Sequence, residues 1–258
     1  MHDDKSGLDT HDHDLWSQVH CWFRSFFAGF VFLAILVTGS SKTEFTSTAK
    51  GSQDIVDLAL VLAVDSSYSV DTTEYRLQME GLASAFQTRE VVDAIKNGPS
   101  GRIAVSVVQW SDLKSQVVVI PWTYISGDKS AAELSQRLNQ TPRQTASGGT
   151  SITTMMKKGA AMLSNLPFYA ERKVIDISAD GRNNNGGDPR PVRNLVAASG
   201  ITINGLAIIN EVITLDQYFE IYITGGPGNF VIVANDYDDY AQAIKRKLIL
   251  EILGPGLV

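Results

Sequence analysis

The sequence predicts an α/β protein with a doubly wound, mostly parallel central sheet, one antiparallel edge strand and helices on both faces. Apolar runs of strand length alternate along the chain with segments whose apolar residues recur at helical spacing. The run 58–64 is continuously apolar, as expected of a parallel strand that is buried on both faces. The runs 102–110 and 116–122 are separated by a short polar stretch, which predicts a hairpin and therefore one antiparallel pair.

The predicted elements follow one another between residues 54 and 253. Strands are expected at 58–64, 102–110, 116–122, 173–178, 201–209 and 230–234. Apolar residues three or four positions apart predict helices at 75–86, 131–138, 152–163, 190–198, 215–223 and 237–253. The stretch Asn97–Gly101 contains Gly and Pro and breaks the chain before the second strand. Acidic residues at the start of the last helix (Asp236, Asp238 and Asp239) suit the positive end of its dipole.

Composition excludes several classes of function. At 258 residues, the chain is long enough for one α/β domain of about 200 residues and an additional segment. All four His residues and the only Cys lie within the first 21 residues, so the predicted domain has no Ser-His-Asp triad, no Cys nucleophile, no His or Cys zinc site and no disulfide. Neither phosphate-binding glycine motif of nucleotide-binding proteins is present. The net charge of −6 argues against nucleic acid or an anionic membrane surface as the main partner.

An uncharged apolar run at residues 26–38 predicts export. It has about 13 residues, which is short for a spanning helix but suits a signal peptide within residues 1–39. The protein is therefore expected in the periplasm or outside the cell. Because the segment before Arg24 is long and acidic, the alternative is an uncleaved anchor that holds residues 26–38 in the inner membrane, and a buried core helix is a third possibility. Residues 40–53 are expected to be a linker, 54–253 the folded domain and 254–258 a tail.

Three short motifs place oxygen-bearing side chains at strand ends or at a helix start. Asp65, Ser67 and Ser69 follow the first strand, Thr150 lies in a Gly-Gly-Thr-Ser-Ile loop that opens a helix, and Asp180 follows the strand 173–178. In open α/β sheets, ligands bind at the carboxyl ends of the strands, so these groups are expected to converge. Hard oxygen ligands with two carboxylates suit Mg²⁺, with Mn²⁺ or Ca²⁺ as alternatives. The alternatives without a metal are that Asp65 and Thr150 cap helices and that Asp180 is an ordinary turn residue.

In this order, the three motifs resemble the metal-ion-dependent adhesion site of von Willebrand factor A-type domains. The resemblance covers about residues 54–252. A closer resemblance, to a family of uncharacterised bacterial proteins within the same superfamily, is carried by the segments 60–65, 174–178, 200–206, 225–228 and 247–252. Ala179 departs from that family, which more often has Gly before the Asp-Gly pair.

The resemblance implies a role for each motif residue. Ser67 and Ser69 would ligate the ion directly, Thr150 directly or through water, and Asp65 and Asp180 mainly through water. An acidic side chain of a partner protein would fill the open position. Tyr68, Arg182 and Asn183 are expected to contact this partner at the rim. The alternatives are a packing role for Tyr68 and a plain flexible loop for residues 182–187.

The function predicted on this basis is an exported, metal-dependent protein-binding module of the adhesion type, which presents Mg²⁺ at the top of the sheet. An enzyme is not expected, because the domain lacks His and the three motifs contain no Lys or Glu that could act as a general base. The alternatives are a metal-independent structural or assembly subunit and, less favoured, a Mg²⁺-assisted hydrolase.

Overall fold

The computed structural model describes residues 54–145 and 148–254. The chain divides into two units, residues 1–48 and 49–258, and every described residue belongs to the second. The expected signal segment 1–39, the linker 40–53 and tail residues 255–258 lie outside the described residues, so their assignment stays a prediction. Among the described helices, none combines the length and apolar character needed to span a bilayer.

The described residues form one six-stranded sheet with the order β3-β2-β1-β4-β5-β6. All neighbouring strands are parallel except β2 and β3, which form the antiparallel pair at one edge. The predicted fold class is therefore confirmed. The strands are β1 (Ile55–Asp65), β2 (Ile103–Trp110), β3 (Gln116–Ile125), β4 (Tyr169–Ala179), β5 (Thr202–Ile208) and β6 (Val231–Ala234).

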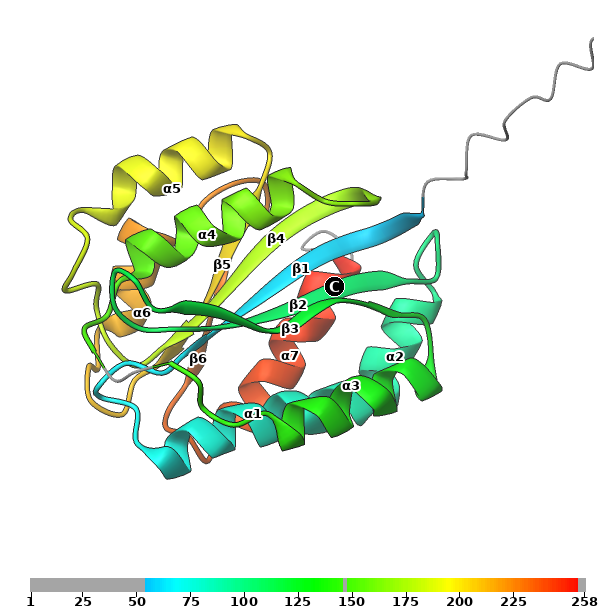
Figure 1. Ribbon diagram of the computed structural model, residues 1–258, viewed down its shortest axis with the longest axis horizontal. Coiled ribbons are helices and arrows are strands. Elements are labelled where there is room, and N and C mark those ends of the chain that lie inside the picture. The colour runs from blue at the N-terminus through cyan, green and yellow to red at the C-terminus, as the bar shows by residue number, and fades with distance from the viewer. Residues whose placement is uncertain (1–53, 146–147, 255–258) are drawn as a thin grey trace, which may run out of the picture. The chain divides into compact units, whose positions relative to one another are not determined.

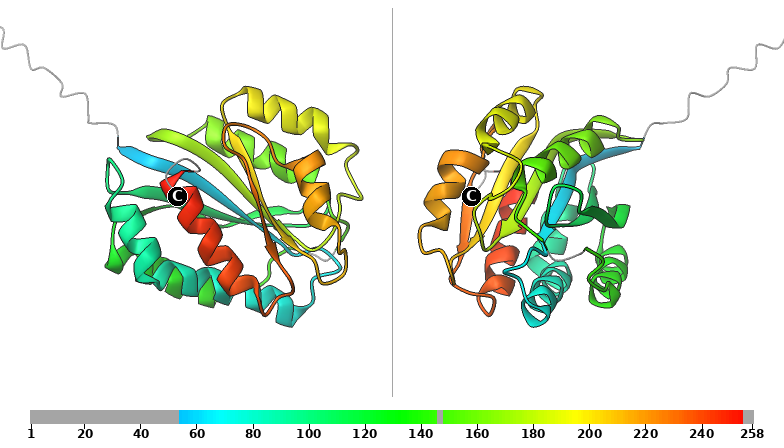
Figure 2. Two further views of the ribbon diagram at one scale, coloured as in Figure 1. Left: turned by 180° about the vertical axis from the view of Figure 1, so that it is seen from behind. Right: turned by 60° about the vertical axis from the view of Figure 1, so that its left-hand side comes forward.

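Helices cover both faces of the sheet (Figure 1). One face packs against α1 (Thr72–Gln87), α2 (Arg89–Lys96), α3 (Asp128–Gln140) and α7 (Tyr240–Leu253). The other packs against α4 (Ile152–Ser164), α5 (Pro189–Ala198), α6 (Leu215–Tyr218) and the π-helical segment η1 (Phe219–Ile223). Figure 2, seen from behind, shows α7 in red lying across its face of the sheet.

Each face of the sheet has its own hydrophobic core, and β1 contributes to both. Successive side chains of a strand point to opposite faces. Accordingly, Leu58, Leu60, Leu62 and Val64 lie in the core beneath α1, α3 and α7, whereas Ala59, Val61 and Ala63 lie in the core beneath α4 and α5. Burial on both faces explains why the sequence of this strand is continuously apolar. It also places the end of β1, at Asp65, in the middle of the sheet.

The observed elements differ from the prediction in one missed helix and in several element boundaries. Helix α2 was not predicted, because the preceding helix ends at Thr88 without the Gly or Pro that usually separates two helices in a sequence. Its buried residues Val91, Val92 and Ile95 nevertheless belong to the core. Strand β1 begins three residues earlier than expected because Asp57 interrupts its apolar pattern, yet the backbone of Asp57 still donates to the carbonyl of Arg102 at 2.9 Å.

Polar contacts join α7 and the turn before it to β4 and to the residue that follows it, and they are spread along the length of this strand. They comprise Tyr237 with Asp180, Tyr240 with Ser178, Lys247 with Asp176, and Arg172 with the carbonyls of Glu251 and Ile252. In the third of these contacts, the ammonium of Lys247 is fully buried and also pairs with Glu251 at 2.5 Å. Asp176, an acid within an otherwise apolar strand, thus has a buried cationic partner.

Candidate metal site

The candidate site lies where the strand order of the sheet reverses. The chain builds outward in one direction from β1 through β2 to β3 and in the other from β4 through β5 to β6. Ligand sites of open α/β sheets form at such a switch point, outside the carboxyl ends of the strands. Asp65 is the last residue of β1 and Asp180 directly follows β4, and the pairing of Val64 with Ser178 places these two ends side by side.

The loop after β1 brings Ser67 and Ser69 towards Asp180. The backbone N–H of Ser67 donates to Asp65 Oδ1 at 2.7 Å, which turns the chain back over the strand end. Ser69 Oγ donates to Asp180 Oδ1 at 2.7 Å, and the hydroxyl oxygens of Ser67 and Ser69 are 3.2 Å apart. Because the proton of Ser69 points to a carboxylate, the lone pairs of its oxygen are available to a cation.

Thr150 lies at the same end of the sheet, in the loop before α4. Its backbone N–H donates to Asn184 Oδ1 at 2.8 Å, and the backbone N–H of Asn184 donates to the carbonyl of Thr150 at 2.9 Å. A Cβ on Gly181 would lie 3.7 Å from Thr150 Oγ1, so this hydroxyl faces the turn that follows Asp180. A Cβ on Gly149 would lie only 2.9 Å from Asn184 Oδ1, which explains why this loop requires glycine. All five predicted residues thus lie at one end of the sheet.

Three supporting residues were missed by the sequence analysis. The guanidinium of Arg143 donates to the carbonyls of Ser66 at 2.5 Å, Ser67 at 3.0 Å and Val70 at 2.8 Å, and so holds the loop after β1 from below. The other two are Tyr237, whose hydroxyl donates to Asp180 Oδ2 at 3.0 Å, and Asn184. Arg143 and Tyr237 carry no local signal, whereas Asn184 lies in the polar loop that the sequence analysis noted beside Asp180.

The alternative that Asp65 and Thr150 cap helices does not match the helix starts that the structure describes. The N-cap of α1 is Asp71, whose side chain accepts from Glu74, rather than Asp65. The N-cap position of α4 is Ser151 rather than Thr150, and that of α5 is Asp188. The candidate residues are therefore not needed for helix capping.

The two aspartates create an electrostatic problem that a cation would solve. Asp65 is fully buried, and its Oδ2 has no hydrogen-bond partner among the described residues. Burial, and then the charge of nearby Asp180, raises the pKa of Asp65 to about 8, although hydrogen bonds from Ser67 and the charge of Arg143 act in the opposite direction. A buried carboxylate beside a second carboxylate is costly unless it is protonated or compensated. A divalent ion would supply that compensation.

The spacing of the hydroxyl oxygens also fits a small cation. In an octahedral site, adjacent ligands are separated by about 3.0 Å for Mg²⁺ and about 3.4 Å for Ca²⁺, given their usual bond lengths. The separation of 3.2 Å between the oxygens of Ser67 and Ser69 falls between these values. Among the described residues, no group of three or more His, Cys, Asp or Glu side chains is placed to hold a metal. Binding here would therefore depend on hydroxyl ligands in addition to Asp65 and Asp180.

The rim of the site carries the three residues predicted to contact a partner. Tyr68 is 84% exposed and lies between Ser67 and Ser69 in the sequence. The guanidinium of Arg182, also exposed, donates to Thr214 Oγ1 at 2.9 Å and lies 5.4 Å from the ring centroid of Tyr218. Asn183 is half-buried, and its Oδ1 accepts from the backbone N–H of Thr153 at 3.1 Å. Tyr68 and Arg182 are thus available at the surface, whereas Asn183 also ties its loop to α4.

A family model described as "Protein of unknown function (DUF1194)" matches residues 55–256 of the chain. The chain belongs to this DUF1194 family. The match spans every strand and helix of the domain and agrees with the expectation of a family without an assigned role inside the von Willebrand factor A superfamily. No match was found among curated proteins.

Solved structures show that the DUF1194 domain has the von Willebrand factor A fold. Proximal thread matrix protein 1 from the mussel byssus has a TM-score of 0.57 and 17% identity, covering 78% of this chain and 48% of that one. A von Willebrand factor type A protein from Catenulispora acidiphila has a TM-score of 0.51 and 15% identity, covering 76% and 43%. The pilus adhesin SpaC from Lactobacillus rhamnosus GG has a TM-score of 0.53 and 14% identity, covering 78% and 31%. This chain thus matches less than half of each of these proteins.

A second structure of the mussel protein is described as having a zinc-occupied MIDAS motif, the metal-ion-dependent adhesion site. It has a TM-score of 0.53 and 17% identity, with coverage of 78% of this chain and 49% of that one. At these identities, the structures establish the fold that they share with the DUF1194 domain, and the chemistry of the site must be argued from its own residues.

Proposed function

We propose that this protein is an exported, metal-dependent protein-binding module of the adhesion type. In this proposal, Ser67, Ser69 and Thr150 hold Mg²⁺ with their hydroxyl oxygens, and Asp65 and Asp180 balance its charge. Mn²⁺ or Ca²⁺ would be the alternative ions. An acidic side chain of a partner protein would complete the coordination, with Tyr68, Arg182 and Asn183 around it. Export rests on the apolar run 26–38, with residence in the periplasm or outside the cell.

The observation that carries the proposal is the buried carboxylate of Asp65, whose Oδ2 lacks a partner among the described residues while Asp180 lies close by. Evolved proteins normally pair or hydrogen-bond such a group. Among the residues that the structure describes, the basic group that lowers the pKa of Asp65 is Arg143, whose hydrogen bonds go to backbone carbonyls. The site therefore has the charge and the oxygen donors that a divalent ion requires.

The comparisons support the proposal at a coarser level. Of two proteins with the same fold, the mussel matrix protein is described with a metal in its adhesion-site motif and the other is described as a pilus adhesin. These descriptions favour a binding function over catalysis. A cation that is held by three neutral hydroxyls would keep an open coordination position and most of its positive charge. It would therefore attract an incoming carboxylate.

The proposal predicts saturable binding of Mg²⁺ and Mn²⁺ to the full chain, measured by isothermal titration calorimetry. Asp180→Ala should abolish this binding, because it removes a carboxylate and the acceptor of the Ser69 hydroxyl. Exposed Asp238→Ala, in the turn that leads to α7, is the matched control and should bind as the unchanged protein does. In a second titration, a short acidic peptide should bind in Mg²⁺ but not in EDTA.

The outcomes of these titrations separate the proposal from its alternatives. Retention of metal binding in Asp180→Ala would rule out the proposed ligand set. Binding of the acidic peptide in EDTA would favour the metal-independent assembly subunit. Metal-dependent hydrolysis of an ester or phosphoester probe, lost in Asp180→Ala, would favour the hydrolase.

Metal affinity should depend on pH, because Mg²⁺ must displace the proton of Asp65. With the pKa of Asp65 raised to about 8 by burial and by the charge of Asp180, this carboxyl is protonated in the metal-free protein at pH 6. For one displaced proton, the apparent Kd should weaken about 50-fold between pH 8 and pH 6, with a slope that approaches about tenfold per pH unit well below pH 8. Calorimetry in two buffers of different ionisation enthalpy should detect release of the proton at pH 7. A Kd that is constant over this range, without proton release, would contradict the prediction.

A further inference from the structure

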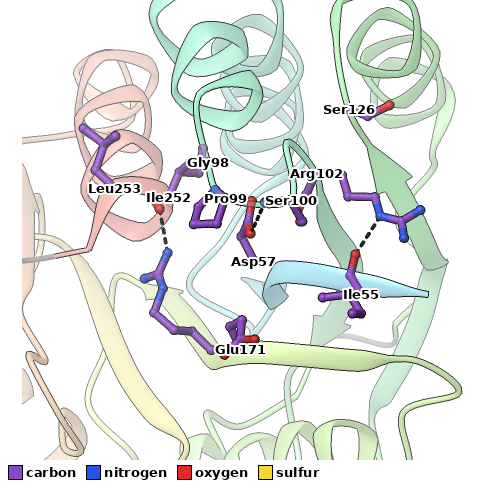
Figure 3. Close-up of a pocket in the computed structure, with 11 residues that line it drawn as sticks. Ile55, Asp57, Gly98, Pro99, Ser100, Arg102, Ser126, Glu171, Ile252 and Leu253 are labelled. Carbon is purple, nitrogen blue, oxygen red and sulfur yellow. Dashed lines mark hydrogen bonds between the residues drawn. The ribbon is translucent and has the colours of Figure 1, made fainter. Parts of the chain in front are cut away.

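A large open pocket lies at the end of the sheet opposite the candidate metal site. Figure 3 shows it between the first residues of β1, the loop that joins α2 to β2, the start of β4 and the end of α7. Its volume is about 880 Å³, which is large enough for a small organic ligand. Because the metal site lies at the carboxyl ends of β1 and β4 and this pocket at their amino ends, the pocket is a separate feature of the fold.

The pocket contains a buried carboxylate with one free oxygen. Asp57 is only 8% exposed, and its Oδ1 accepts from the backbone N–H of Ser100 at 2.7 Å. Its Oδ2 has no hydrogen-bond partner among the described residues. This oxygen is itself buried and lies against Gly98, where an added Cβ would collide with it. In Figure 3, Asp57 stands at the centre of the lining residues.

The basic groups of the pocket are already engaged in the fold. Arg102 donates through Nε to the carbonyl of Ile55 at 2.6 Å and through Nη2 to Asp54 at 3.3 Å. Arg172 donates to the carbonyls of Glu251 at 2.7 Å and Ile252 at 2.6 Å, which are backbone acceptors at the end of α7.

The acidic groups of the pocket are less engaged than its basic groups. The lining contains two carboxylates (Asp57 and Glu171) and two guanidiniums (Arg102 and Arg172), and Asp54, outside the lining, pairs with Arg102. Glu171 is exposed at the mouth and forms no ion pair within the described part of the chain.

The remaining walls are apolar. Ile55, Pro99, Ile252 and Leu253 surround the acidic centre, and Ile55 is 47% exposed although it belongs to a strand. A ligand that satisfies both features needs a positive group for Asp57 and a hydrocarbon part for these side chains. We propose that this pocket binds an organic cation, an ammonium or guanidinium group on an apolar body, with Asp57 as its counter-ion and Glu171 as a second acidic contact.

The test uses the full chain and three probes of matched length: n-hexylammonium, n-hexanol and hexanoate. Ligand-observed NMR titration should show saturable binding of n-hexylammonium, with n-hexanol at least tenfold weaker and hexanoate weaker still. Asp57→Asn should weaken the ammonium probe at least tenfold, and Glu171→Gln several-fold. Asp57→Asn keeps the oxygen that accepts from Ser100, and Glu171 is exposed, so both variants are expected to fold. Asp93→Asn, on the exposed side of α2, is the matched control and should leave binding unchanged.

A further arm replaces the amine with a tripeptide that has a central lysine and blocked ends. Tighter binding of n-hexylammonium would identify a free small molecule as the ligand, and tighter binding of the peptide would identify the lysine side chain of a polypeptide. Both results support an organic cation site. Equal binding of n-hexanol and n-hexylammonium, preference for hexanoate, no binding of any probe, or full binding by Asp57→Asn would each overturn the proposal.

Discussion

Asp65→Asn is expected to abolish Mg²⁺ binding and, at the same time, to stabilise the metal-free protein at alkaline pH. Asparagine retains the oxygen that accepts from the backbone of Ser67, but it removes a buried negative charge next to Asp180. The gain in the free energy of unfolding at pH 8.5 should be about 1–3 kcal/mol, the usual cost of an unsatisfied buried polar group. Urea denaturation in EDTA measures this gain, and Mg²⁺ titration measures the loss of binding.

The gain in the free energy of unfolding of Asp65→Asn should depend on pH, and its sign follows from the pKa of Asp65. The pKa of Asp65 in the folded state, raised to about 8, lies above its ordinary value of 3.8, so the folded state holds a proton more tightly than the unfolded chain does. The contribution of Asp65 to stability is fully present below pH 4 and is lost as the pH rises through 8. Asp65→Asn should therefore match the unchanged protein near pH 4 and exceed it at pH 8.5.

Added Mg²⁺ should reverse the order at pH 8.5, because a ligand that binds only the folded state stabilises it. The unchanged protein should gain stability in Mg²⁺, and Asp65→Asn should not. Asp238→Asn, at an exposed position, should behave as the unchanged protein in every condition. A variant that loses stability at alkaline pH in EDTA would show that Asp65 is a structural acid and not a strained metal site.

Lys247→Met is expected to cause the largest loss of stability of any single substitution considered for this protein. Its ammonium is fully buried, lies 2.9 Å from Asp176 Oδ1 and 2.5 Å from Glu251 Oε1, and has the ring centroid of Phe230 at 5.1 Å. Methionine fills a similar volume but leaves two buried carboxylates without a counter-ion. Breaking a buried ion pair from one side typically costs about 3–5 kcal/mol. Urea denaturation at pH 7 would measure the change.

Lys245→Met on the same helix is the matched control. Lys245 pairs with Glu90 at 3.7 Å near the surface, so its replacement should cost less than about 1 kcal/mol. The loss in Lys247→Met should be largely recovered when Asp176→Asn and Glu251→Gln are added, because all three groups are then neutral. Equal losses in the two lysine variants would show that the buried cluster adds nothing beyond a surface pair.

Within the buried cluster, the pKa of Asp176 differs from that of an ordinary aspartate. Burial raises the pKa of Asp176 to about 7, against the opposing charge of Lys247 and with a further increase from Glu251. For Lys247 itself, burial favours the neutral form, but the two carboxylates outweigh it and raise its pKa. Removing Lys247 removes the group that lowers the pKa of Asp176. The loss of stability in Lys247→Met should therefore grow as the pH rises through 7, where Asp176 ionises in the unchanged protein.

The order of the elements and the positions of the predicted ligands could be read from the sequence. The apolar run 58–64 identifies a strand buried on both faces, and the alternation of strands and helices then requires a mostly parallel sheet. In such a sheet, parallel strands have their carboxyl ends at the same end of the sheet. Asp65 and Asp180 therefore had to lie at that end, whatever the order of their strands. The short spacing of Asp65, Ser67 and Ser69 acts in the same way, because one turn can bring all three together.

The sequence did not reveal which groups from distant parts of the chain contact the candidate site residues, because these contacts depend on the tertiary structure. Arg143 is 76 residues away from Ser67 yet holds its carbonyl, and Tyr237 is 57 residues away from Asp180 yet donates to it. The same holds for the pocket around Asp57, which depends on the ends of elements that are far apart in the chain. Local sequence restricts backbone conformation and the direction of burial within one element. The pairing of polar side chains, by contrast, depends on how packed elements are finally positioned, to within the short range of a hydrogen bond.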